Sequence, residues 1–158
     1  MSISPTRFRY GGDSMTHEDG PKFSGKHGAD AQADPKATDR IKQNAVNGEV
    51  ACAVAFQIVD ELNITPAEVG KAIDLLDYRI IKCQMGLFGY RPDKKAVKSH
   101  APEDQQLEQA IRDALVDEKL ACRDAWSLAS RFNVPKMTVS GACEALGIKI
   151  KPCQLGAL

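Results

Sequence analysis

Apolar residues recur at helical spacing in three stretches of the chain, and the same stretches return seventy residues later. Leu107, Ile111 and Leu115 lie at i, i+4 and i+8, which predicts an amphipathic helix that begins near residue 104. Residues 50–62 and 66–76 predict two further helices, which recur at 120–132 and 136–146. Short alternation with β-branched residues at 78–83 and 148–153 predicts that each copy ends in a strand.

The helix ends carry recognisable signals. Asp34-Pro35 is a capping residue followed by the residue best tolerated at the first helical position, so a helix is expected over 34–47. Asn63 and Asn133 are suited to the left-handed conformation that closes a helix, and Thr65 is suited to cap the next one. Each copy therefore reads as helix, helix, turn, helix and strand.

Residues 34–88 repeat at 104–158 with a constant offset of 70 and no gap. Ordinary composition gives roughly 3 or 4 identities over such a length by chance, whereas the copies share 14 in 55 positions: Asp34/Asp104, Ile41/Ile111, Val46/Val116, Ala51/Ala121, Cys52/Cys122, Ala55/Ala125, Asn63/Asn133, Val69/Val139, Ala72/Ala142, Leu76/Leu146, Ile80/Ile150, Cys83/Cys153, Gln84/Gln154 and Gly86/Gly156. We interpret this as an internal duplication. Units of this size are near the lower limit for independent folding, so we expect the copies to pack on each other or on a partner.

The pattern predicts a mainly α protein with two tandem units, at residues 34–90 and 104–158. Residues 1–33 lack a sustained apolar period and form either a disordered tail or an arm that orders on a partner. Phe8, Tyr10 and Phe23 favour the second interpretation, because aromatic side chains are unusual in a solvated segment. Residues 91–103 are a basic linker or a wing.

The formal net charge is zero, yet the copies differ in sign. Residues 49–88 carry three Lys/Arg and six Asp/Glu, while residues 118–158 carry six and three. The strongest basic stretch contains Arg79, Lys82, Arg91, Lys94, Lys95 and Lys98. It is either a wing that contacts DNA phosphates or a solvated linker. No apolar run approaches the length of a membrane span or a signal peptide, so we expect a cytoplasmic protein with reduced cysteines.

The segments 58–72 and 128–142 resemble the helix-turn-helix superfamily. Leu128, Phe132, Val134, Val139 and Ala142 occupy the apolar positions of that motif. In the first copy the same positions hold Ile58, Leu62, Ile64, Val69 and Ala72, and Val59 stands where the motif usually has a small residue. With the terminal strand, each unit is similar to a winged helix. The resemblance implies a DNA-binding transcription regulator, in which Lys136, Thr138 and Ser140 face outward from the third helix of the second copy. Arg131, Lys149 and Lys151 lie around that helix, and the basic stretch assists.

Two repeated features allow other interpretations. In the pairs Cys52/Cys83 and Cys122/Cys153, the first cysteine lies at the start of the second helix and the second at the end of the strand. Each pair is either a thiol site or two small core residues. No zinc-type spacing accompanies them, so no metal or cofactor is expected. Leu87, Phe88 and Tyr90 form either an apolar hook for a partner or homodimer, or a cover over the seam between the copies.

The sequence contains no phosphate-binding glycine loop and no nucleophile motif, so neither an enzyme nor a small-molecule substrate is expected. Two functions of different class therefore remain. The first is the DNA-binding regulator. The second is a non-catalytic accessory subunit of a larger complex, in which the helix-turn-helix units and the amino-terminal arm bind protein; the acidic first copy and the zero net charge favour it.

Overall fold

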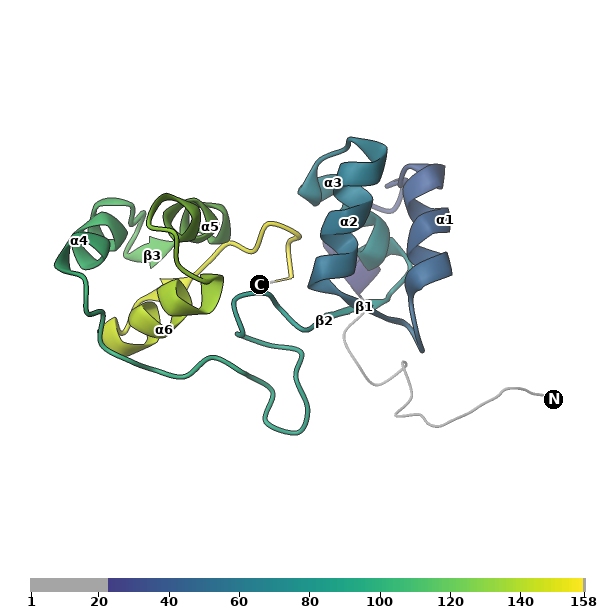
Figure 1. Cartoon of the computed structure of the whole chain (residues 1–158). Helices are drawn as coiled ribbons and strands as arrows, with labels where there is room; N and C mark the ends of the chain where they lie inside the picture. Colours follow the sequence, from purple (N-terminus) through teal and green to yellow (C-terminus); the bar gives the residue numbers. More distant parts are fainter. Residues whose placement is uncertain (1–22, 158) are drawn as a thin grey trace.

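The computed structural model describes residues 23–157, and Figure 1 shows two helical groups joined by a long connection. After the short 3₁₀ helix η2 (Phe23–Lys26), the first group contains α1 (Pro35–Asn44), β1 (Glu49–Ala51), α2 (Cys52–Leu62), α3 (Pro66–Leu75) and β2 (Arg79–Ile81). The second contains α4 (Gln105–Asp113), β3 (Lys119–Leu120), α5 (Cys122–Arg131), α6 (Lys136–Leu146) and β4 (Lys149–Ile150). The predicted mainly helical class is confirmed. None of the helices within this described part is long and apolar enough to cross a membrane.

The helix ends follow the local signals in the sequence. The Asp34 side chain accepts a hydrogen bond from the Lys36 amide and Pro35 opens α1. Asn63 and Asn133 adopt left-handed backbone conformations, with φ of 54° and 55°. Thr65 and Glu68 form a reciprocal capping box at the start of α3. These expectations are confirmed. The sequence could predict them because each depends on residues close together in the chain.

The terminal strands pair with two short strands that the sequence pattern did not predict. β1 pairs with β2 in parallel, with Glu49 beside Arg79, and β3 pairs with β4 in parallel, with Lys119 beside Lys149. β1 and β3 each lie between the first and second helices of a copy. β1 and β3 lie outside the alternating stretches at 78–83 and 148–153, so only the tertiary structure reveals them.

Each group completes its core with a segment from the other. Met85, which follows β2, packs in the core of the second group with Leu107, Ile111 and Leu120. Leu155, which follows β4, packs in the core of the first group. Figure 1 shows the chain after β2 running toward the second group and the yellow carboxy-terminal segment running back toward the first. The packing units therefore do not coincide with the sequence units 34–90 and 104–158.

Equivalent aromatic residues meet where the two groups join. The rings of Phe56 and Trp126, seventy residues apart, have their centroids 4.5 Å from each other. Phe88 packs against both cores. Reciprocal contacts between equivalent residues are the mark of a two-fold symmetric dimer. The two copies associate within one chain as the subunits of such a dimer do.

Candidate functional site

The three predicted residues on the third helix of the second copy differ in their exposure to solvent. Lys136 is half-buried, with its Nζ 4.5 Å above the Trp126 ring, and Thr138 is also half-buried. Ser140 is 0% exposed, and its hydroxyl donates to the Met85 carbonyl oxygen at 2.6 Å. The prediction that Ser140 faces outward is wrong, because the segment that follows β2 lies over it.

That segment covers the rest of the same helix face. A methyl group on Gly141 would lie 2.7 Å from the Lys98 carbonyl oxygen, so this part of α6 touches the chain backbone. The Gly141 carbonyl oxygen accepts from the His100 amide at 3.2 Å, and Lys95 Nζ lies 2.9 Å from Glu144 Oε1. Residues 85–100 therefore lie along the α6 face that carries Ser140, Gly141 and Glu144.

The third helix of the first copy is covered at the equivalent place. A methyl group on Gly70, the counterpart of Ser140, would lie 1.9 Å from the Leu155 carbonyl oxygen. The buried Asp74 carboxylate contacts Lys26 Nζ at 3.1 Å and His27 Nε2 at 3.0 Å. The carboxy-terminal segment and the residues around η2 thus lie on α3, as residues 85–100 lie on α6.

The basic stretch is exposed, but its cations have different surroundings. Arg91 pairs with Glu49, and Lys95 with Glu144. Within residues 23–157, no ion pair involves the other predicted members, which are Arg79, Lys82, Lys94 and Lys98. Neither interpretation, wing or linker, describes this segment fully, since it runs along α6 and also lines a pocket.

The predicted apolar hook is integrated into the fold. Leu87 and Phe88 are half-buried and pack against the cores, and the Tyr90 hydroxyl donates to the Cys83 carbonyl oxygen at 2.5 Å. Burial raises the pKa of Tyr90. These contacts favour the interpretation as a cover over the seam between the copies. Phe8 and Tyr10 lie outside the described residues.

An exposed row of lysines lies on β3 and β4 and just after β4; we call this region the β3–β4 edge. The parallel register places Lys119 beside Lys149, Lys151 follows, and all three are exposed. Arg131, also exposed, lies with its guanidinium 5.1 Å from the Phe132 ring centroid. Lys149 and Lys151 follow from the predicted strand at 148–153, whereas Lys119 belongs to β3, which no pattern in the sequence predicts.

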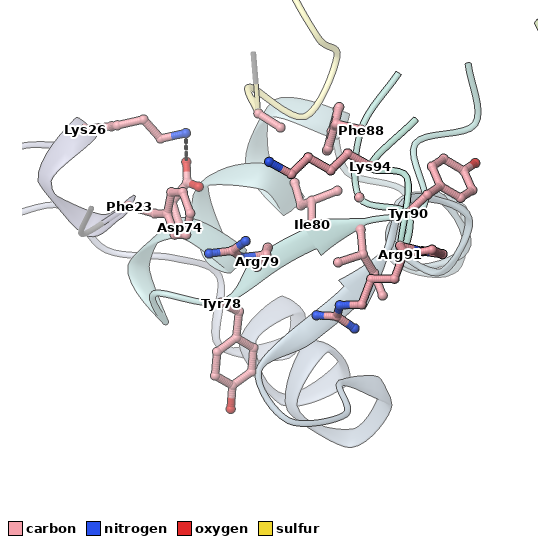
Figure 2. A pocket seen from close by; sticks show the side chains of 14 residues that line it. Phe23, Lys26, Asp74, Tyr78, Arg79, Ile80, Phe88, Tyr90, Arg91 and Lys94 are labelled. Carbon is pink, nitrogen blue, oxygen red and sulfur yellow. Dashed lines mark ion pairs between the residues drawn. The ribbon is translucent and has the colours of Figure 1, made fainter. Parts of the chain in front are cut away.

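A pocket of about 590 Å³ opens beside β2, shown in Figure 2. Arg79, Arg91, Lys94, Phe88 and Tyr90 line it together, although the sequence analysis placed them in two separate groups. The lining also includes Phe23, an aromatic residue of the predicted amino-terminal arm, and Lys26 and Tyr78, which the sequence did not mark as site residues. Phe23 and Lys26 come from a segment with no apolar period, and Tyr78 precedes β2, so only the tertiary structure brings them here.

The repeated thiols lie in equivalent environments. Gln84 Nε2 lies 3.7 Å from Cys52 Sγ, and Gln154 Nε2 lies 3.6 Å from Cys122 Sγ. Burial raises the pKa of Cys52 and Cys83, and that of Cys122 to about 11. No group of three or more His, Cys, Asp or Glu side chains in the described part of the chain is arranged to hold a metal ion. Burial in the neutral form matches the interpretation as small core residues.

Comparison with family models, with curated proteins and with solved structures gives no match to this chain. The features that bear on function are therefore two cationic regions, the β3–β4 edge and the pocket beside β2.

Proposed function

We propose that the chain is a DNA-binding protein that contacts the phosphate backbone through the β3–β4 edge of its second copy. The observation that carries the proposal is the pairing of Lys119 with Lys149 on adjacent parallel strands. Like charges held side by side repel, and a polyanion removes that repulsion. No acidic side chain within residues 23–157 forms an ion pair with either lysine.

The first copy provides an internal comparison. Its equivalent register pair is Glu49 and Arg79, which have opposite charges, and the Glu49 carboxylate also binds Arg91. The equivalent register pair is thus charge-balanced in the first copy and cationic in the second. This difference supports the second copy as the side that faces DNA, in agreement with its excess of basic residues.

The covered third helices define the kind of DNA contact that we propose. Since residues 85–100 lie on the α6 face, we propose backbone contacts from Lys119, Lys149 and Lys151, with the exposed Arg131 as a further cation of the second copy. Phosphate contacts position a protein on DNA without reading its sequence. Base recognition by α6, and with it a role in transcription regulation, would require residues 85–100 to leave this face.

The test measures binding to a short DNA duplex by fluorescence anisotropy over a series of salt concentrations. In the variant K119Q/K149Q, we expect weaker binding and a slope of log K against log [salt] that is smaller by about 2, since two phosphate contacts are lost. The matched control, K36Q/K42Q, removes the same charge from exposed positions of α1. No binding by the native chain at about 50 mM salt, or equal losses in both variants, would overturn the proposal.

A second candidate is a protein-binding accessory subunit, and one observation favours it. Val46 and Val116, at equivalent turns of the two copies, are each 68% exposed. The two valines give the copies equivalent exposed apolar positions for contact with a protein partner. Absence of DNA binding at low salt, combined with self-association that Val116→Asp abolishes, would favour this candidate over the first.

A further inference from the structure

We propose that the pocket beside β2 binds a small organic anion that carries a phosphate or carboxylate head on a flat apolar body. The inference is independent of the DNA-binding proposal, because none of the pocket residues belongs to the β3–β4 edge. It assigns a ligand class to a region that the sequence analysis treated as a linker and a hook.

The size and walls of the pocket fit a small molecule. Its volume of about 590 Å³ lies within the range of ligand sites in proteins. The wall is apolar along Ile80 and Phe88, with the ring of Phe23 on the opposite side in Figure 2. Tyr78 and Tyr90 also line the pocket and are half-buried, although the Tyr78 ring points away from Phe23 and Phe88 in Figure 2. Aromatic side chains of this kind pack against a planar apolar body.

Four cations surround this apolar space: Lys26, Arg79, Arg91 and Lys94. Two of them have acidic partners, since Lys26 pairs with Asp74 and Arg91 with Glu49. Arg79 and Lys94 form no ion pair within the described residues. Figure 2 shows the ends of Lys26, Arg79 and Lys94 on the same side of the pocket, around Asp74.

The acidic residue of the pocket does not cancel this charge. Asp74 is 5% exposed, and its carboxylate already contacts Lys26 and His27. An anionic head would therefore meet Arg79 and Lys94. The planar guanidinium of Arg79 donates two parallel hydrogen bonds to a carboxylate or phosphate, and the ammonium of Lys94 supplies a second charge.

Three distant segments enclose the pocket, which makes it a property of the folded chain. η2 is fixed by the Ser24 amide, which donates to Asp77 Oδ1 at 2.9 Å, and by Lys26, which donates to the Gly156 carbonyl oxygen at 2.8 Å. Ala157 of the exchanged carboxy-terminal segment also lines the pocket. An occupant would contact both the first copy and the segment that the second copy places on it.

The test uses three probes and amide NMR spectra of the full chain. Phenyl phosphate has both the head and the body, inorganic phosphate has only the head, and benzyl alcohol has only the body. We expect phenyl phosphate to shift the amides of residues 79–81, 88–91 and 93–94. Each partial probe should bind at least about tenfold more weakly than phenyl phosphate. In R79Q/K94Q, the affinity for phenyl phosphate should fall about tenfold. K119Q/K149Q, which removes the same charge outside the pocket, should bind it as the native chain does.

Each result has a defined meaning. Absence of shifts with phenyl phosphate in the low millimolar range would overturn the proposal, as would shifts that R79Q/K94Q leaves unchanged. Equal affinity for inorganic phosphate and phenyl phosphate would also overturn it, since the apolar body would then contribute nothing. Loss of DNA binding in K119Q/K149Q with intact phenyl phosphate binding would separate this site from the proposed DNA edge.

Discussion

Gly70 and Ser140, at equivalent positions of α3 and α6, each lie against a backbone carbonyl group but contact it differently. At Gly70 there is no space for a side chain, because a Cβ there would lie 1.9 Å from the Leu155 carbonyl oxygen. Its counterpart Ser140 donates a hydrogen bond to the carbonyl oxygen of Met85, the counterpart of Leu155. The sequence shows Ser140 as a polar residue on a helix, and only the tertiary contact shows that it is structural.

Replacing Ser140 with alanine separates a structural role from a role in reading DNA. The change leaves the buried Met85 carbonyl oxygen without its donor, so we expect the free energy of unfolding to fall by about 1–3 kcal/mol. DNA affinity per folded molecule should not change. Urea unfolding and anisotropy titrations measure the two quantities, with the exposed Ser130→Ala as the control. A specific loss of DNA affinity with native stability would restore the outward prediction for Ser140.

Buried thiols make stability depend on pH in the alkaline range. Burial raises the pKa of Cys122 and Cys143 to about 11 from an ordinary value of 9.0. Above pH 9 the unfolded chain loses these protons while the folded chain retains them, so rising pH favours unfolding. Their contribution is complete below pH 9 and is lost between pH 9 and 11.

We therefore expect the free energy of unfolding to fall by about 1 kcal/mol for each thiol between about pH 8 and pH 10. Urea unfolding at the two pH values measures this loss. Because lysines and tyrosines also titrate there, the comparison is with C122A/C143A, which should lose less stability over the same interval. Parallel losses in the native chain and the variant would contradict the assignment of this effect to the thiols.

At the scale of elements, the duplicated third helices begin differently. α3 has the Thr65–Glu68 capping box, whereas Pro135 precedes α6 and provides no side-chain cap. Proline supplies a fixed φ but no acceptor for the free amides of the first turn. The start of α3 is therefore encoded locally, while α6 depends more on the residues that lie over it.

Thr65→Ala should lower the free energy of unfolding by about 1 kcal/mol, because the first turn of α3 loses its acceptor. Thr38→Ala, inside α1, is the control and should have a small or stabilising effect, since alanine is the better helix former. Urea unfolding of both variants measures the difference. Similar values for the two substitutions would show that the capping box contributes nothing measurable.

At the scale of the whole molecule, the reciprocal exchange of segments makes the two copies depend on each other. Leu155 completes the first core and Met85 the second. The pocket beside β2 also needs the carboxy-terminal segment, which contributes Ala157. Displacement of this segment should therefore affect both the stability of the first copy and the pocket.

Gly70→Ala tests this dependence, because the new methyl group would displace the Leu155 backbone. We expect a loss of about 1–3 kcal/mol in the free energy of unfolding, together with faster hydrogen exchange at the Gly156 amide, which donates to the Cys153 carbonyl oxygen. Gly28→Ala, where no atom lies within 4 Å of the new group, is the matched control. If the Gly156 amide exchanged in Gly70→Ala as slowly as in the native chain, this would contradict the packing of the carboxy-terminal segment against Gly70.

The sequence by itself determined the duplication, the mainly helical class, the approximate bounds of the helices and the caps at Asp34 and Thr65. These features depend on periodicity and on residues within one helical turn of each other. The tertiary structure alone decided the pairing of β1 and β3, the burial of Ser140, the exchange of Met85 and Leu155, and the meeting of Phe23, Arg79 and Lys94 in one pocket. Each of these joins residues far apart in the chain, and their contact depends on how the two copies pack rather than on any local preference.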